Sequence, residues 1–510
     1  MLININFVIV VLCEVLLSVN AANVLILFNH FGRSHYFQGK ALGHGLARAG
    51  HEVTMVSVFQ DNKKIKGYKE IHLDGILENL GMETNFVKVP KMSLPRMQFF
   101  YHPFSLNYTE RTLKHPKFQA LLKSNETFDV IIMEELTNAA LKALSWHFKA
   151  PLILFCPFAP HTPIHLLAGN IAPPAYVANT FLGYTHFMTF WERSVNTFSY
   201  IFEVLFYHWI TTPTQEDLMK KYFPDSPNLA DIDKNVSLFL INNHESINSP
   251  IPHVPNMINI LGFHLQDKTE LPKDLKEYMD EAKDGAILFS FGSFIHPSQM
   301  DPKIKEAIIK SLGKLKQKVV WKTDEENFTG KPANMKLSKW VPQEAILAHP
   351  NCKLFITHGG FLSTIETIYH GVPILAVPFI GDQDLNSGRM VELGVGLKTD
   401  LNEITEEKLD YLLNQLLNNK KYRENAKKRS NLIRDRPIKP IDLAVYWVEY
   451  VMRHRDLSHM RVAALELRWY QYLLLDVILV WSIGAFVVIF SIYFILKMLF
   501  CRQKAKVKTN

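Results

Sequence analysis

The sequence predicts an α/β protein with two doubly wound domains, each a parallel sheet covered by helices, followed by one transmembrane helix. Three observations lead to this prediction. Short apolar runs alternate with helical stretches in both halves of the chain. A proline-rich stretch at 250–272 separates the halves, and an uncharged apolar run of 20 residues lies near the end. With 510 residues, the chain is long enough for two to four domains of about 100–200 residues.

The first half is expected to begin with a strand, a helix that ends near Ala49 and a second strand. Another helix should begin near Asn138, between two further strands. Apolar runs typical of buried strands occupy residues 23–28, 51–58, 129–133 and 152–156. Between 157 and 255 the alternation fades. The aromatic run at 198–210 is too short to span a bilayer and fits a pocket wall, a membrane surface or an ordinary core helix.

The second half resumes the alternation and ends in helices over 405–435 and 440–455. Its predicted strands are residues 286–290, 318–323, 335–340, 353–357 and 373–378. These patterns divide the chain into seven predicted segments. They are a signal peptide at 1–21, a first domain at 22–250, a linker at 251–283, a second domain at 284–455, a juxtamembrane segment at 456–475, a transmembrane helix at 476–497 and a basic cytoplasmic tail at 498–510.

Both ends of the chain carry membrane-related patterns. The apolar run at 7–19, interrupted by Glu14, precedes small residues and is typical of a secretory signal, with a buried first helix as the alternative. The run at 477–496 is long enough for a helix to cross about 30 Å of hydrocarbon, with a core helix as the alternative. The basic tail then falls on the cytoplasmic side, and the bulk of the protein is lumenal or extracellular.

The composition argues against two classes of protein. The net charge is +7, but five positive charges lie in the last 14 residues, so residues 1–496 carry only +2 and nucleic acid is not an expected partner. Of the four cysteines, Cys13 lies in the signal and Cys501 beside the membrane. Cys156 and Cys352 lie in strand-like runs, where free buried thiols are more typical than a disulfide scaffold. No Cys/His spacing suits zinc, and no metal is expected.

Two features fit a protein retained in the endoplasmic reticulum. Glycosylation sequons begin at Asn107, Asn125, Asn235 and Asn327, all in the exported part. The last five residues (KVKTN) place lysines five and three residues from the end, which resembles a dilysine retrieval signal. A merely basic flank is the alternative. The sequence leaves open whether the chain forms homo-oligomers.

The loops that follow the predicted strands are the candidate ligand sites, because ligands of open parallel sheets bind beyond the carboxyl ends of the strands. After the strand at 286–290, Gly292 lets the backbone approach an anion, and the hydroxyl of Ser293 can donate to it. After the strand at 353–357, His358 and two glycines precede a helix whose N-terminus suits a diphosphate. Ordinary structural turns would explain these glycines equally well.

Residues 340–383 have a sequence that is more distinctive than that of an ordinary turn. They read WVPQEAILAHPNCKLFITHGGFLSTIETIYHGVPILAVPFIGDQ, and these 44 residues closely resemble the signature of the UDP-glycosyltransferase family. The likeness extends to Ser34 and His35 and to segments 188–196, 254–264 and 435–454. The signal, the terminal span and the tail resemble the membrane-bound animal branch, and HGGFLSTIETIYHG resembles arthropod members. The resemblance implies the GT-B fold, in which two Rossmann-like domains face a cleft.

The resemblance also implies roles in binding a UDP-sugar. Trp340 would stack on the uracil, Gln343 would lie beside the nucleoside, and Glu366 would hold the ribose hydroxyls. Asp382 and Gln383 would bind hydroxyls of the sugar.

The diphosphate would be held by His358, by Ser293 beside Gly292, and by backbone N–H groups of Leu362 and Ser363. Leu362 stands where many relatives have Asn, so a side-chain donor to phosphate is lost there.

For the first domain, the resemblance implies the acceptor site and the catalytic base. His35 would take a proton from an acceptor hydroxyl as that oxygen attacks the anomeric carbon. A carboxylate on the other ring nitrogen would fix the tautomer. The family usually has Asp at the position of Glu134, which is one methylene longer; Glu135 and Asp129 are the alternative partners.

The expected activity is inverting transfer of a hexose, glucose in preference, from a UDP-sugar to a hydroxyl of a small lipophilic acceptor, as in detoxification. UDP-glucuronate or UDP-galactose as donor and a lipid or protein acceptor are alternatives. A membrane-anchored carrier of hydrophobic small molecules is the non-enzymatic alternative. The UDP-sugar is a co-substrate, and no cofactor is expected. We expect a single-pass type I protein of the endoplasmic reticulum membrane with lumenal catalytic domains.

Overall fold

The structure is a computed structural model that describes residues 21–61, 63–78, 87, 91–265, 270–293, 295–328 and 330–507, the last seven without their side chains. Residues 1–20 of the predicted signal peptide and the final lysine at 508 lie outside the described residues. The chain folds as two units, residues 1–460 and 461–510.

The first unit begins with a seven-stranded parallel sheet of order β3-β2-β1-β4-β5-β6-β7. Its strands are β1 (Asn23–Phe28), β2 (Glu52–Ser57), β3 (Tyr68–His72), β4 (Val130–Glu134), β5 (Leu152–Cys156), β6 (Leu238–Ile241) and β7 (Met257–Asn259). The strands β4, β5 and β6 are buried throughout. Continuous apolar runs are typical of parallel sheets because helices cover both faces.

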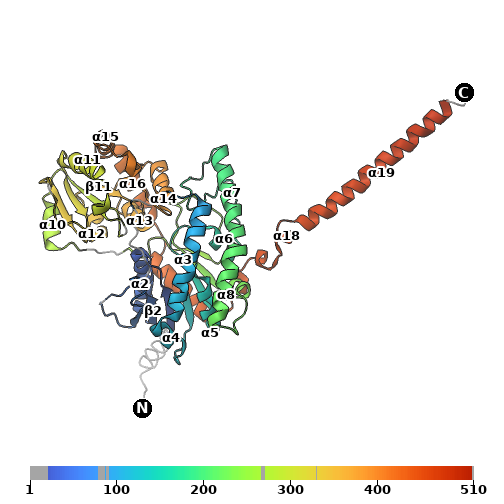
Figure 1. The fold of residues 1–510 in the computed structure, drawn as a ribbon, viewed down its shortest axis with the longest axis horizontal. Helices are drawn as coiled ribbons and strands as arrows, with labels where there is room; N and C mark the ends of the chain where they lie inside the picture. Colours follow the sequence, from blue (N-terminus) through green and yellow to red (C-terminus); the bar gives the residue numbers. More distant parts are fainter. Residues whose placement is uncertain are drawn as a thin grey trace, which may run out of the picture. The chain divides into compact units, whose positions relative to one another are not determined.

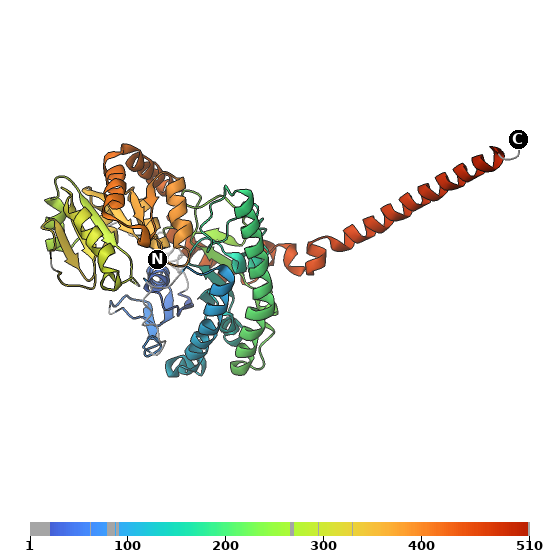
Figure 2. The same cartoon turned by 45° about the horizontal axis from the view of Figure 1, so that its top comes forward.

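Helices cover this sheet on both faces. They are α2 (Arg33–Arg48), α3 (Leu94–Lys114), α4 (Pro116–Leu122), η1 (Ala139–Lys142), α5 (Ala143–His147), α6 (Thr162–Ala168), α7 (Phe190–Phe206), η2 (Tyr207–Thr211), α8 (Thr212–Tyr222) and α9 (Leu229–Lys234). Alternate residues of β1 enter two different cores. Leu25 and Leu27 belong to one, and Val24 and Ile26 to the other. Helices α3 and α7 lie side by side in both views (Figures 1 and 2).

A second parallel sheet has six strands in the order β10-β9-β8-β11-β12-β13. They are β8 (Ala286–Ser290), β9 (Lys318–Lys322), β10 (Met335–Ser338), β11 (Cys352–Thr357), β12 (Ile374–Ala376) and β13 (Gly396–Lys398). The helices and 3₁₀ turns that accompany it are α10 (Lys273–Asp280), η3 (Pro297–Gln299), α11 (Pro302–Gly313), α12 (Gln343–Ala348), α13 (Phe361–Tyr369), α14 (Gln383–Glu392), η4 (Leu401–Glu403), α15 (Glu406–Asn418) and α16 (Lys420–Arg434). The predicted fold class, two doubly wound α/β domains, is confirmed.

The proline-rich stretch at 250–272 is not a plain linker. Strand β7 lies inside it and pairs with β6, which completes the first sheet. Helix α10 lies in the predicted linker and packs Leu275 and Met279 with the core of the second sheet. Strand β7 therefore lies past the predicted boundary at 250, and α10 lies before the predicted start of the second domain at 284. Three residues are enough to form an edge strand, and so short a run has no periodicity that the sequence reveals.

The last helix of the first unit, α17 (Pro440–His454), belongs with the first sheet although it follows the second. Its residues Ala444, Val448 and Val451 are fully buried in the core that contains Val24 and Ile26. Helix α17 therefore falls within the predicted second domain at 284–455 in sequence but packs in a core of the first sheet. An apolar helix face shows that the helix is buried, but it does not show which sheet it covers.

The aromatic run at 198–210 forms the end of α7 and η2, and its two faces differ. Ser199, Glu203 and Phe206 are buried, whereas Phe198 and Trp209 are 62% and 71% exposed. The buried face contributes Glu203 and Phe206 to the wall of a cavity, as the pocket-wall prediction requires. The outer face leaves the membrane-surface alternative open.

The 3₁₀ turn η5 (Ser458–Met460) ends the first unit. The second unit contains the 3₁₀ turn η6 (Ala463–Glu466), then α18 (Trp469–Tyr472) and the long helix α19 (Leu475–Val507). Residues 475–500 of α19 have a mean hydropathy of 2.5, and by length and composition they can cross a membrane. This segment coincides with the predicted transmembrane helix at 476–497.

Cys156 and Cys352 are free and buried, as predicted. The four sequon asparagines are exposed, at Asn107, Asn125, Asn235 and Asn327. Whether they carry glycans stays a prediction.

We predict that Lys142→Ala destabilises the first unit. The Lys142 side chain is fully buried, with Nζ 3.2 Å from Glu135 Oε2 and 2.7 Å from Asp233 Oδ1. Its removal leaves the buried Glu135 carboxylate without a partner, which costs about 3–5 kcal/mol. A thermal unfolding midpoint of the full chain in detergent should fall by several degrees.

The control is Lys69→Ala, which removes an exposed ion pair with Glu126 that is worth about 0–1 kcal/mol. Equal midpoints for the two variants would contradict the structural role of Lys142.

Candidate active site

One cavity of about 970 Å³ lies between the two α/β domains and is lined by residues of both. Its wall includes residues that follow β1, β4 and β5 of the first sheet and β8, β11 and β12 of the second. These are carboxyl ends of parallel strands, where doubly wound sheets bind their ligands. All twelve residues selected from the sequence line this cavity: His35, Glu134, Gly292, Ser293, Trp340, Gln343, His358, Leu362, Ser363, Glu366, Asp382 and Gln383.

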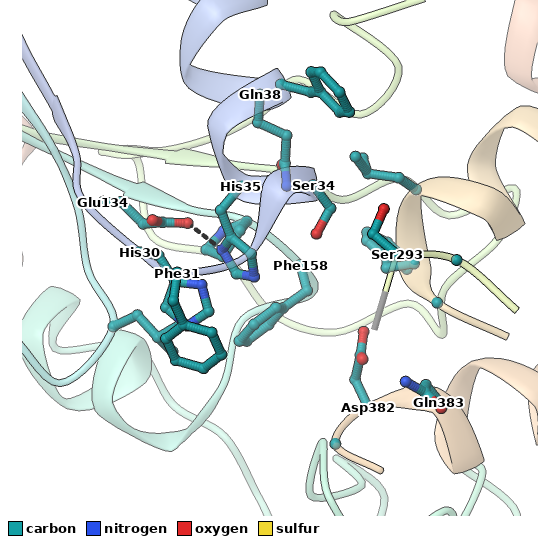
Figure 3. Close-up of a pocket in the computed structure, with 18 of the residues that line it drawn as sticks. His30, Phe31, Ser34, His35, Gln38, Glu134, Phe158, Ser293, Asp382 and Gln383 are labelled. Carbon is teal, nitrogen blue, oxygen red and sulfur yellow. Dashed lines mark hydrogen bonds and ion pairs between the residues drawn. The ribbon is translucent and has the colours of Figure 1, made fainter. Parts of the chain in front are cut away.

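On the first-domain side, His35 and Glu134 form a hydrogen-bonded pair (Figure 3). His35 lies in the first turn of α2, and Glu134 ends β4 beside β1. His35 Nδ1 lies 2.5 Å from Glu134 Oε1, and the Glu134 side chain is only 1% exposed. Because an ionised carboxylate only accepts hydrogen bonds, Nδ1 carries the proton and Nε2 keeps a free lone pair. An imidazole held in this way can accept a proton.

The two alternative carboxylates have other partners. Glu135 pairs with the buried Lys142, and Asp129 accepts a hydrogen bond from the backbone N–H of Asn23 at 2.9 Å. Glu134 is thus the carboxylate that contacts His35, although its side chain is one methylene longer than the usual Asp.

A second histidine, His30, lies against His35 and is not among the residues selected from the sequence. The rings of His30 and His35 lie 3.9 Å apart between centroids, and His30 Nδ1 accepts the N–H of Gly32 at 3.0 Å. Burial, and then the neighbouring His35, hold the pKa of His30 well below its usual range. His30 is therefore neutral at pH 7. Its place just after β1 is the signal that could have identified it.

On the second-domain side, the cavity wall contains the exposed Trp340 and a hydrogen-bonded group of Gln343, Glu366 and Ser363. The Trp340 ring is 55% exposed, with Lys322 Nζ 4.6 Å from its centroid. Gln343 Nε2 donates to Glu366 Oε2 at 2.7 Å and to Ser363 Oγ at 3.0 Å. Burial raises the pKa of Glu366 to about 8, against the opposing effect of the Gln343 hydrogen bond.

The His358 ring lies against two glycines. Gly292 follows β8, and Gly360 is the residue directly before α13. Burial, and then the charge of Lys322, lower the pKa of His358 to about 4, so this imidazole is neutral at pH 7. The first N–H groups of α13, including that of Leu362, have no acceptor within the helix and can bind an anion. The Leu362 side chain is half-buried and packs against an apolar core.

Asp382 and Gln383 lie at the start of α14, across the cavity from His35 (Figure 3). Asp382 Oδ2 accepts a hydrogen bond from Asn386 Nδ2 at 2.8 Å, and burial raises the pKa of Asp382. Gln383 Oε1 accepts the N–H groups of Phe379 and Ile380, which leaves its amide N–H groups for a ligand.

Lys322 is a further cavity residue that was not selected from the sequence. It ends β9, and its Nζ donates to the Gly292 carbonyl at 3.0 Å. The rule that ligands bind beyond strand ends could have selected it, because the predicted strand at 318–323 contains it.

Residues 35–510 match the family described as UDP-glucoronosyl and UDP-glucosyl transferase. The chain belongs to this family. It is 36% identical over 470 residues to "UDP-glycosyltransferase UGT4" of Dactylopius coccus, with 90% of this chain and 92% of that protein covered. It is 32% identical to "UDP-glucuronosyltransferase 1A9" of Mus musculus, with 92% and 90% covered.

Solved structures support the same assignment at the level of the fold. The calicheamicin glycosyltransferase CalG4 aligns with a TM-score of 0.58 and 18% identity, covering 86% of this chain and all of that one. The glycotransferase of kitacinnamycin aligns with a TM-score of 0.56 and 17% identity, covering 84% and 98%. This UDP-glycosyltransferase therefore has the GT-B fold. Its family implies a UDP-sugar donor and an acceptor, and α19 suggests that the enzyme is anchored in a membrane.

We predict that Gly292→Ala weakens the binding of UDP by about 10-fold or more. Gly292 has φ +79°, and a Cβ there would lie 2.8 Å from Cε1 and 2.9 Å from Nε2 of His358. The left-handed conformation alone costs a non-glycine residue about 1–2 kcal/mol. Calorimetric titration with UDP measures the effect.

The matched control is Gly330→Ala, because Gly330 has the same φ of +79° and open space around its Cβ position. Equal UDP affinity in both variants would show that the contact with His358 does not matter.

Proposed function

We propose that this UDP-glycosyltransferase transfers glucose from UDP-glucose, with inversion, to a hydroxyl of a small lipophilic acceptor, and that His35 is the general base. The observation that supports this most is the contact between His35 Nδ1 and the buried Glu134, within the cavity that also contains His358. The contact leaves His35 Nε2 as the proton acceptor. This arrangement would have no use in a carrier, which only binds its ligand.

In the proposed reaction, His35 Nε2 removes the proton of the acceptor hydroxyl while its oxygen attacks the anomeric carbon. The bond from that carbon to the UDP oxygen breaks, and UDP leaves with the electron pair. One displacement converts an α-linked donor into a β-glycoside. Glu134 stabilises the imidazolium that forms, and its own hydrogen bond keeps the ring oriented.

The proposed nucleoside contacts use groups that are already in place. The exposed face of Trp340 suits the uracil ring. Glu366 is positioned by Gln343, and its two oxygens suit the vicinal hydroxyls of ribose. Asp382 and the amide of Gln383 would bind hydroxyls of the sugar.

The diphosphate would be bound by neutral donors. His358 donates a hydrogen bond without a charge, beside Ser293 and the N–H groups of Leu362 and Ser363. Lys322 lies close enough to Gly292 to supply a positive charge at the same end of the cavity. We propose that no metal takes part.

Glucose is proposed as the sugar for two reasons. The HGGFLSTIETIYHG segment resembles arthropod members of the family. The chain is also 34% identical to "UDP-glucosyltransferase 2" of Dactylopius coccus, with 92% of each chain covered. A lipophilic acceptor is proposed because aromatic side chains line the first-domain half of the cavity. They include Phe31, Phe104, Tyr108, Phe158 and Phe206. A role in detoxification of such compounds fits both proposals.

The proposed location is the endoplasmic reticulum membrane. A signal at 1–21 and the span at 475–500 would place both α/β domains in the lumen, where the four exposed sequons can be glycosylated. Enzymatic removal of N-glycans from the expressed chain should then increase its electrophoretic mobility.

The test of donor and activity is UDP release by membranes that contain the full chain, with 4-propylphenol as acceptor. UDP-glucose, UDP-glucuronate and UDP-galactose are compared as donors. We expect acceptor-dependent release with UDP-glucose. Release with UDP-glucuronate alone would overturn the proposed donor. Absence of release with a broad set of phenols and alcohols, despite UDP binding, would favour a macromolecular acceptor or a carrier.

We predict that His35→Ala keeps the affinity for UDP-glucose within about 2-fold and lowers the transfer rate by roughly 10²- to 10⁴-fold, the usual range for a general base. His102→Ala is the matched control, because His102 lies on α3 and is half-buried against Phe206 and Thr214. Loss of donor binding in His35→Ala, or an equal loss of rate in the control, would argue against the proposed role.

A further inference from the structure

Glu203 is a buried carboxylate in the wall of the cavity, and the proposed reaction does not use it. It lies on the inner face of α7, and only 5% of the residue is exposed. It belongs to the acceptor half of the cavity, with Gln98 and Tyr101 of α3 and Phe206 one turn further along α7.

Within the described part of the chain, the hydrogen bonds to Glu203 come from neutral groups only. Oε2 accepts from the hydroxyl of Thr162 and from Asn179 Nδ2 at 2.6 Å, and Oε1 accepts from Gln98 Nε2 at 3.2 Å. A carboxylate has about four lone-pair positions, so one position on Oε1 stays available.

Glu203 has no cationic partner among the residues that the structure describes. In the same half of the cavity, Glu134 pairs with His35 and Glu135 pairs with Lys142. The Lys40 side chain, which also lines the cavity, pairs with Asp61.

The nearby histidine His161 does not supply a charge either. Burial, and then the proximity of His165, lower the pKa of His161 to about 3. Buried charges in proteins are normally paired, because removal of a carboxylate from water is costly. Accordingly, burial raises the pKa of Glu203, although three hydrogen bonds oppose this. A carboxylate of this kind in a cavity wall marks a candidate binding position.

We infer that Glu203 forms an acceptor subsite for an ammonium group, so that the enzyme accepts hydroxylated amines with the hydroxyl at His35 and the ammonium at Glu203. The rings of Tyr101 and Phe206 stand one helical turn from Gln98 and Glu203, and aromatic faces also attract cations. This inference rests on the proposed function for the position of the reacting hydroxyl.

Tyramine and 4-propylphenol test the subsite, because they share a phenol and differ only in an ammonium against a methyl group at the end of the chain. We expect Glu203→Gln to lower kcat/KM for tyramine by roughly 10- to 100-fold, the range for a lost charge-assisted hydrogen bond. For 4-propylphenol the change should stay within about 3-fold. The affinity for UDP-glucose should stay the same, which shows that the variant is folded.

A second variant, Gln98→Lys, places a cation beside Glu203 Oε1 and should cause the same selective loss for tyramine. An equal fall for both acceptors in Glu203→Gln would show that Glu203 only joins α3, α6 and α7, and would overturn the inference. Unchanged tyramine kinetics in both variants would overturn it as well.

Direct binding separates this inference from the proposed function. If no donor supports transfer, calorimetric titration of the full chain with tyramine and 4-propylphenol still tests the subsite. Tyramine should bind the unaltered chain at least about 10-fold more tightly than it binds Glu203→Gln. Equal tyramine affinity would overturn the subsite, whatever the reaction.

Discussion

The hydrogen bond between His35 and Glu134 is the contact on which the site depends. The two residues are 99 positions apart, and they meet because β1 and β4 are parallel neighbours whose carboxyl ends share one edge of the sheet. The register pairs Leu27 with Met133, so the loop after β1 and the last residue of β4 reach the same level. A slip by one residue would turn Glu134 to the other face of the sheet.

Helix α2, which carries His35, packs against α17 at the end of the first unit. Helix α17 packs on α2, where Ile441 lies against Gly45, a position at which a larger side chain would clash. His51, which is buried next to β2, lies 3.3 Å from Glu449 of α17. A segment that follows the second domain therefore packs on the helix that carries His35. This return contact joins the two domains on either side of the cavity.

Burial favours the neutral form of several ionisable side chains in the cavity. His30 and His358 are kept neutral, and the pKa of Glu366 is raised to about 8. A site with these properties acts through oriented hydrogen bonds more than through net charge. Such bonds are strong where water is excluded, and their geometry selects a ligand. Glu134 differs from these groups, because it contacts the His35 ring directly and would stabilise an imidazolium in the proposed reaction.

The sequence by itself determined β1, β2, β4 and β5 of the first sheet and β8 to β12 of the second, together with the two α/β domains, the donor-side loops and the family. Apolar runs and contiguous motifs are local features. The short strands β3, β6 and β13 were not predicted. It also identified His35 and Glu134, although it did not determine which carboxylate contacts the histidine. The tertiary structure alone decided that β7 belongs to the first sheet and that α17 packs beside α2. It also decided that Glu203 lies in the cavity wall without a cationic partner among the described residues. These features depend on contacts between segments tens to hundreds of residues apart. No local pattern encodes the partner of a helix face or of a short edge strand, because packing of the whole chain selects it.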